Sequence, residues 1–376
     1  MAGTKPVVLL LDRGNIRTNA AGAKSTTLYQ GKTIPSAGLK HATAANGDKA
    51  FPADVTYPNV AQDAWTTKAL TSGLWRGEVP KFSVLWMSDP DFSQHDSGPG
   101  SEAAIGALDS VDRNLTSVVN ALEQKKVLTK TDILVVSDHG FSTIHHGVDV
   151  AACLRRAGFN AARKFDDPEP GDVIVDGLGG SVFLYVVDHK EDVVRGVVDT
   201  LQASDFAGVI FSRIAIEGTF PLEQVKMAHA NAPDIVVSMR WTDEASETGA
   251  PGMLIGESGK RGKGTHGSLS KYDMHNTLIA YGPDFKAGFV NEMPSGNADL
   301  VPTLLTILGQ GVPASVDGRV LSEALTTSIG EPPKAEQKTV EASHAGTVHR
   351  WRQYLKYSTV GKAIYFDEGN GAAEVK

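Results

Sequence analysis

Residues 82–100 read FSVLWMSDPDFSQHDSGPG, an apolar run followed directly by a polar loop. The apolar run is typical of a buried strand in a parallel sheet, because both faces of such a strand are covered. The loop carries Asp91 and His95 just beyond that strand. Ligands of open α/β sheets bind beyond the carboxyl ends of the strands, so we expect these two side chains at a binding site.

Further short apolar runs predict strands at 7–11, 133–136, 235–237 and 277–281. Ahead of the second of these runs, the apolar spacing from Ile105 to Leu122 predicts a helix with Ser101 as its N-cap. A helix of that length suits a crossover between parallel strands. The pattern therefore predicts an α/β fold, a three-layer sandwich with a mostly parallel central sheet and helices on both faces.

The turn and strand signals also suggest how the chain is organised. We expect one domain over residues 1–330, with a peripheral insertion at about 160–232 that holds a turn and the strand-like run 181–187. Residues 331–376 are expected as a polar C-terminal tail to which no function is assigned. A helix over 350–357 is one possibility within that tail.

Composition excludes several classes of protein. The 376 residues are 41% hydrophobic and 21% charged, which is ordinary for a globular protein. The net charge of −8 argues against a surface that coats nucleic acid, and no apolar run reaches the length of a membrane span. We expect no signal peptide, because the apolar run at 7–11 is short and ends at Asp12. The localisation is left open. Cys153 is the single cysteine, so no intrachain disulfide can form.

Two other segments end in the same residue types as the loop at 82–100. The strand expected at 133–136 runs into Ser-Asp-His-Gly, which contains Asp138 and His139, and Gly-Thr-His-Gly places His266 ahead of the strand at 277–281. Carboxylate and imidazole together suit zinc or a similar divalent ion. Each motif alone is also compatible with a solvated turn, but their occurrence together, at strand ends, predicts a metal centre.

This order of motifs resembles the type I phosphodiesterase/nucleotide pyrophosphatase branch of the alkaline phosphatase superfamily. The resemblance covers roughly residues 80–325 and includes segments that the superfamily shares near its end. Those segments are Gly282-Pro283-Asp284-Phe285, 299–305 and 317–321. The resemblance implies an alkaline-phosphatase-like fold and a hydrolase that acts on small phosphate esters.

The resemblance also implies two divalent metal ions, with zinc favoured and manganese as the alternative. Asp91, His95 and His266 would hold one ion, and Asp138 and His139 would help to hold the second. In the family the two ions flank the reacting phosphoryl group, and a serine or threonine nucleophile forms a covalent phospho-enzyme that water then cleaves. Substrate-binding and catalytic residues are left unassigned.

Substrate class and supporting residues follow less directly. Phosphodiesters such as nucleotides rank first by resemblance, phosphomonoesters and phosphonates next. Sulfate esters rank lower, because the sequence lacks the Cys-x-Pro-x-Arg or Ser-x-Pro-x-Arg segment of sulfatases.

Asp89 is a candidate for supporting the metal ligands. Asp273 and His275 could orient them or could be polar residues at a strand edge.

The family's second ion also takes an aspartate from the first strand, and here two alignments compete. In one, Asp12 is that aspartate and the nucleophile is Ser25, Thr26 or Thr27. In the other, residues 2–40 are the segment that normally follows the nucleophile, so the chain is truncated at its N-terminus. We favour the second alignment. It leaves an alternative function, a truncated or remodelled family member that binds metal with little or no turnover.

Overall fold

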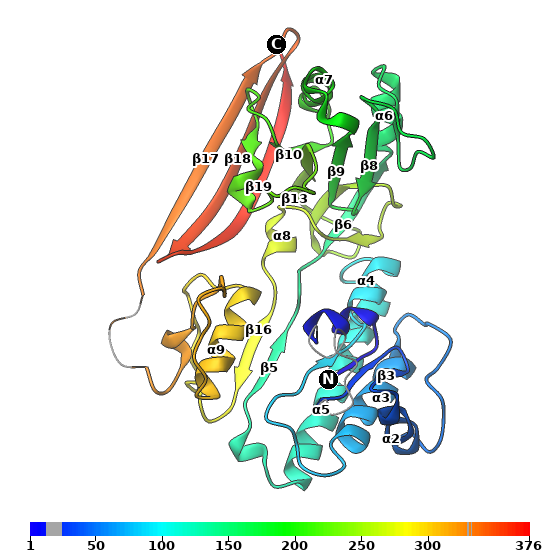
Figure 1. Ribbon diagram of the computed structural model, residues 1–376, viewed down its shortest axis with the longest axis vertical. Coiled ribbons are helices and arrows are strands. Elements are labelled where there is room, and N and C mark those ends of the chain that lie inside the picture. The colour runs from blue at the N-terminus through cyan, green and yellow to red at the C-terminus, as the bar shows by residue number, and fades with distance from the viewer. Residues whose placement is uncertain (13–24, 329–330, 332) are drawn as a thin grey trace. The chain divides into compact units, whose positions relative to one another are not determined.

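The computed structural model describes residues 1–12, 25–328, 331 and 333–376. The chain divides into two compact units, Met1–Asp132 and Ile133–Lys376, which we describe separately (Figure 1). The boundary falls directly before the strand expected at 133–136. The expectation of one domain with an insertion and a polar tail stays a prediction.

The first unit combines a small sheet with helices. Its strands are β1 (Ala2–Gly3), β2 (Thr27–Tyr29), β3 (Lys32–Ile34) and β4 (Leu85–Trp86), in the order β3-β2-β1-β4. β1 pairs in parallel with both β2 and β4. The helical segments are η1 (Pro6–Leu11), η2 (Ser36–Gly38), α2 (Leu39–Ala45), α3 (Val60–Lys68), η3 (Ala69–Leu74), α4 (Asp91–Ser97), α5 (Glu102–Gln124) and η4 (Leu128–Lys130).

Helix α5 confirms the helix expected between the strands at 82–87 and 133–136. The Ser101 side chain accepts a hydrogen bond from the backbone N–H of Ala104, as an N-cap does. Leu122 is buried, and α5 packs on α3.

The strand predicted at 7–11 is wrong, because these residues form the 3-10 helix η1. Pro6 stands at its first position, where a fixed φ favours a helical start and the missing N–H costs nothing. Val8 is fully buried while Leu10 is 68% exposed, so the run is not buried on both faces. An apolar run of five residues cannot by periodicity alone distinguish a strand from one turn of helix.

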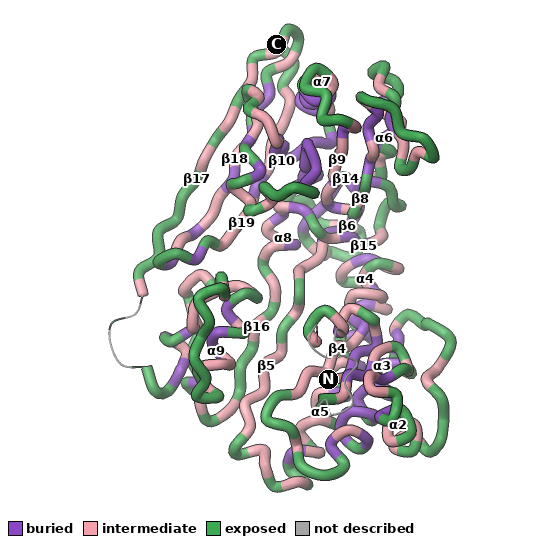
Figure 2. Tube along the Cα trace, viewed as in Figure 1, coloured by how far each residue is buried: buried purple, intermediate pink, exposed green. Residues whose placement is uncertain are grey.

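The described residues of the second unit form four sheets. The largest, in the order β11-β10-β12-β9-β8-β7, consists of β7 (Ala161–Ala162), β8 (Val173–Gly177), β9 (Ser181–Val186), β10 (Ala207–Ser212), β11 (Phe220–Pro221) and β12 (Ile235–Met239). Its buried residues form the main core together with α6 (Val150–Arg156) and α7 (Glu191–Gln202), as Figure 2 shows. η5 (Val187–His189) and η6 (Leu222–Val225) lie between these elements. The segment expected as an insertion, 160–232, therefore shares a sheet with the strand expected at 235–237.

Two smaller sheets carry the segments of interest for function. One, in the order β13-β14-β6-β15, contains β6 (Ser142–Val148), β13 (Trp241–Ala245), β14 (Pro251–Glu257) and β15 (Gly264–Thr265). The other pairs β5 (Ile133–Val136) with β16 (Leu278–Tyr281) in antiparallel register. Parallel and antiparallel ladders are thus mixed. The expectation of a mostly parallel sheet came from apolar runs, which indicate that a strand is buried but not which direction it takes. The short segments α8 (Lys271–Met274), η7 (Asn297–Asp299), α9 (Leu300–Ile307) and η8 (Ser322–Ala324) complete this part.

The segment expected as a polar tail contains a three-stranded antiparallel sheet. Its strands are β17 (Ala335–Ala345), β18 (His349–Val360) and β19 (Ala363–Val375). The possible helix over 350–357 is wrong. Trp351, Gln353 and Leu355 are buried at every second position, which is the period of a strand. The Gln353 side chain also bonds both backbone groups of Ile210 on β10, at 2.7 and 3.1 Å. Within the described residues, no helix is both long and apolar enough to cross a membrane.

Candidate metal centre

Helix α4 of the first unit carries two of the expected metal ligands. Asp91 is its first residue and His95 lies one turn later, so both project from one face. The Nε2 atom of His95 lies 3.4 Å from Oδ1 of Asp91. His95 is exposed and Asp91 half-buried, which leaves both side chains accessible to an ion.

A positive group already contacts the Asp91 carboxylate. The Lys5 ammonium bonds Oδ2 of Asp91 and also lies 4.5 Å from the centre of the Phe92 ring. Burial acts to raise the pKa of Asp91, but hydrogen bonds from His95 and Lys5 and their charges hold it well below its usual range. The carboxylate is therefore ionised at neutral pH, in the form that ligates a metal.

A buried polar network holds the turn before α4. Oδ1 of Asp89 accepts from the backbone N–H of Ser93 at 3.1 Å, which fixes the start of the helix, and Oδ2 accepts from the N–H of Asn59 at 2.5 Å. The buried Asp63 in turn accepts from the N–H groups of Ser88 and Asp89 at 2.8 and 3.1 Å. Burial raises the pKa of Asp63 against these hydrogen bonds. Asp89 thus holds the start of the helix that carries the two expected ligands.

In the second unit, the Ser-Asp-His-Gly loop leaves the end of β5. The Nδ1 atom of His139 lies 2.8 Å from the carbonyl oxygen of Gly140, which can only accept, so Nδ1 is the protonated nitrogen. In the neutral form of the ring the lone pair is then on Nε2, which lies 3.6 Å from Oδ2 of Asp138. This tautomer presents Nε2 to a metal. Gly140 is required here, because a Cβ would collide with the backbone carbonyl of Tyr272.

His266 lies against His139. The two rings stack with their centres 3.5 Å apart and 14° between their planes, and Phe141 packs edge-on against His266 at 5.1 Å. Three expected ligands, Asp138, His139 and His266, are therefore brought together within this unit. Carboxylate and imidazole are donor types that zinc takes, and the expected assignment divides these three residues between two neighbouring ions.

Asp273 connects the two loops that carry these histidines. The buried carboxylate accepts from the Ser142 hydroxyl at 2.6 Å, and from the N–H and hydroxyl of Ser268 at 3.0 and 2.6 Å. Burial raises the pKa of Asp273 despite these bonds. Ser142 follows His139 by three residues, and Ser268 follows His266 by two. Of the two roles that the sequence left open for Asp273, this geometry favours orienting the ligands.

Three further residues were missed by sequence reasoning. Asn276 and Asn297 donate side-chain hydrogen bonds to the backbone of the Ser-Asp-His-Gly loop. Asp63 anchors the turn before α4. Asparagine at a loop has many roles, and no local pattern indicates which distant carbonyl it bonds. The one signal near Asn297 is the superfamily segment at 299–305, which begins two residues later.

The residues proposed to complete the second ion's site lie in the first unit. The Thr27 hydroxyl is buried in β2 and bonds Oδ2 of Asp12, which ends η1. Ser25 is exposed and Thr26 half-buried. Whether Asp12 joins Asp138, and whether Asp91 and His95 converge with His266, concerns both units together and stays a prediction.

Comparisons with known proteins agree with the motifs. The family model described as type I phosphodiesterase/nucleotide pyrophosphatase matches residues 4–269. The chain therefore belongs to that family, within the alkaline phosphatase superfamily, and the expected resemblance is confirmed. Ectonucleotide pyrophosphatase/phosphodiesterase family member 3 is similar to it at 34% identity in the mouse and 23% in the rat. Each alignment covers 71% of this chain and 29% of the relative, so the chain spans less than a third of their length.

A solved structure supports the fold. Human ectonucleotide pyrophosphatase/phosphodiesterase 5 superposes with a TM-score of 0.51 at 18% identity, over 73% of this chain and 65% of that one. At this identity the likeness concerns the fold alone. The expected α/β class, alkaline-phosphatase-like, is confirmed.

Proposed function

We propose that this chain hydrolyses phosphate esters with two bound divalent ions, and that phosphodiesters such as nucleotides are the first substrate class. One observation carries the proposal. Asp138 and His139 are neighbours that lie far from His266 in the sequence, yet His139 stacks on His266 in the second unit. The His139 tautomer leaves Nε2 as the nitrogen that can ligate a metal. The family's description supports the substrate class.

Each expected ligand has a role in this proposal. Asp91, His95 and His266 hold one ion, with the ionised Asp91 carboxylate supplying charge and the imidazoles supplying neutral donors. Asp138 and His139 help to hold the second. Bound divalent ions supply Lewis-acid stabilisation of charge on a phosphoryl group and lower the pKa of a bound hydroxyl or water. The stacked rings and the Asp273 bridge fix the directions of the donors.

A panel of nitrophenyl esters tests the reaction and its class. The purified chain is stripped with a chelator, reloaded with zinc or with manganese, and assayed on phosphodiester, phosphomonoester, phosphonate and sulfate esters. We expect metal-dependent cleavage with the phosphodiester first. No divalent ion bound after zinc addition, by elemental analysis, would refute the metal centre. Preference for the phosphonate or phosphomonoester would move the substrate to the second class.

A second candidate function is metal binding with little or no turnover. The burial of Thr27 favours this candidate, because a buried hydroxyl is closed to substrate, whereas the bond of Thr27 to Asp12 is what the competent alignment requires. Single changes of Asp12, Ser25, Thr26 and Thr27 to alanine separate the two functions. Vigorous activity that one of these changes abolishes assigns that residue to the site. Feeble activity that none of them alters supports the second candidate.

A further inference from the structure

The end of β5 is held by side chains from two distant segments. Nδ2 of Asn276 donates to the carbonyl of Ser137 at 2.7 Å. Nδ2 of Asn297 donates to the carbonyls of both Ser137 and Asp138, at 3.2 and 3.1 Å. The Ser137 hydroxyl accepts from the N–H of Thr277 at 2.9 Å. Asn297 is thus the side chain that bonds the peptide group of the expected ligand Asp138 itself.

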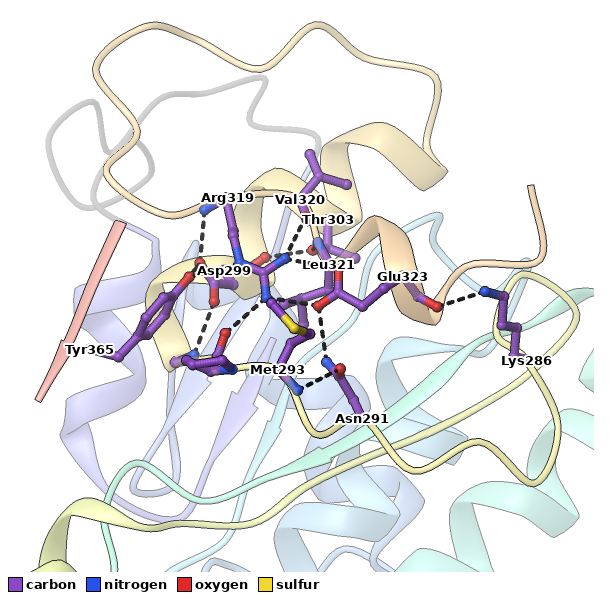
Figure 3. A network of polar contacts seen from close by, with 12 residues as sticks. Lys286, Asn291, Met293, Asp299, Thr303, Arg319, Val320, Leu321, Glu323 and Tyr365 are labelled. Atoms are coloured by element: carbon purple, nitrogen blue, oxygen red, sulfur yellow. Dashed lines mark hydrogen bonds and ion pairs between the residues drawn. The ribbon is translucent and has the colours of Figure 1, made fainter. Parts of the chain in front are cut away.

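The turn that carries Asn297 is built around a buried carboxylate. Asp299 is fully buried, and its Oδ2 accepts from the N–H of Gly296 at 3.0 Å, which closes the turn of η7. Its Oδ1 accepts from the N–H of Arg319 at 2.8 Å and from the Tyr365 hydroxyl at 3.2 Å (Figure 3). The turn that carries Asn297 is therefore held by Asp299 and Arg319 of the shared superfamily segments and by Tyr365 of β19.

Arg319 completes this arrangement. Its guanidinium makes a two-fold ion pair with the Glu323 carboxylate at 2.7 and 2.8 Å, and its Nε donates to the Tyr365 hydroxyl at 3.0 Å (Figure 3). It also donates to the carbonyl of Pro294 at 2.8 Å, just ahead of the turn. Burial, together with the Asp299 charge, raises the pKa of Tyr365 to about 12, so the phenol keeps the proton it donates to Asp299.

We propose that Asn297 is a positioning residue for the site of the second metal ion, because its side chain fixes the backbone of Asp138. The network of Asp299, Arg319, Glu323 and Tyr365 in turn holds the turn that carries Asn297. The metal part of this inference rests on the proposed function, whereas the backbone part does not. The Asp138 side chain is 52% exposed and lies on a loop. Direct bonds to two successive carbonyls therefore restrict the directions that its carboxylate can take.

The test compares Asn297→Ala with Asn160→Ala in the full chain. Both asparagines are exposed, and Asn160 donates a shorter bond, at 2.6 Å, to the carboxylate of Asp172, away from the ligand loops. In the metal-free chain we expect amide hydrogen exchange of residues 137–141 to quicken about fivefold in Asn297→Ala, as loss of one hydrogen bond predicts. In a zinc titration we expect the second ion to bind about tenfold more weakly and the first unchanged. Asn160→Ala should match the parent in both measurements.

Two results would overturn the inference. One is exchange of residues 137–141 that stays at the parent rate in Asn297→Ala. The other is exchange that quickens equally across the whole second unit, which would indicate a general structural role. If the parent takes up no second ion, the proposed function fails, and the exchange measurement still decides the role of Asn297. Tyr365→Phe, which removes the phenol from Asp299, should produce a smaller change at 137–141 in the same direction.

Discussion

His139 combines a fixed tautomer, a stacked neighbour and an adjacent carboxylate in one residue. We expect His139→Ala to weaken zinc binding at the second position about 10- to 100-fold while the first position keeps most of its affinity. The reason is that Asp91, His95 and His266 all keep their ligand atoms, and His266 keeps its contact with Phe141. A competition titration against a chromophoric chelator measures both sites. Equal loss at both positions would contradict the assignment of ligands to two separate ions.

Asp273 is the residue that joins the loops of the two stacked histidines. Asp273→Ala leaves the buried donors of Ser142 and Ser268 without an acceptor, so we expect it to lower the free energy of unfolding by about 3 kcal/mol. Urea unfolding of the metal-free chain measures this loss. Asp243→Ala is the matched control, because that carboxylate is exposed. A loss no larger than the control's would show that Asp273 does not hold the loops.

At the scale of elements, the Arg319–Glu323 pair joins η8 to the segment that precedes it. Burial acts to raise the pKa of Glu323, but hydrogen bonds and charge from Arg319 hold it below its ordinary value of 4.5. A lowered folded pKa contributes stability that is fully present above the unfolded value and is lost as pH falls through the folded value. We therefore expect Glu323→Gln to lower the free energy of unfolding by about 2 kcal/mol at pH 7. The difference from the parent should shrink progressively below about pH 4.

Urea unfolding at a series of pH values measures this difference. Asp317→Asn is the control on the same segment, since its pair with Lys226 is 3.5 Å long and largely exposed and should contribute nothing measurable. A Glu323→Gln effect that stays constant from pH 7 to pH 3 would mean that the ion pair is not its source.

At the scale of the whole molecule, the first metal ion would take ligands from both units. A ligand that binds only the folded state stabilises it by mass action, about 2.7 kcal/mol at a hundredfold excess over Kd. We expect zinc to raise the unfolding midpoint of the parent by several degrees in calorimetry. Asp91→Ala, in the first unit, and His266→Ala, in the second, should each abolish most of this rise. His229→Ala, an exposed histidine of the second unit, should behave as the parent. A rise that persists in Asp91→Ala would mean that zinc binds without the first unit.

Local patterns in the sequence were sufficient for the parts of the structure that depend on neighbours along the chain. Ser101 caps α5 as its residue type predicts. The segment with Asp91 and His95, expected as a loop, instead forms α4 and places the two residues one turn apart. The Ser-Asp-His-Gly loop follows a strand as expected. The same reasoning failed at 7–11, a short apolar run, and at 350–357, a mixed run. Both runs are compatible with the helical and the strand period, and burial against distant residues selects between the two.

The contacts that orient the site could not be read in this way, because they join residues more than a hundred positions apart. The stacking of His139 on His266, the Asp273 bridge to Ser142 and the bond of Asn297 to Asp138 each depend on loops that meet only when the second unit is folded. A side chain's residue type limits what it can bond, but its partner is set by which backbone groups the packing of the sheets brings within 3 Å. The residue types that could ligate a metal are therefore a local property of this chain, whereas the directions of their side chains are a property of its tertiary structure.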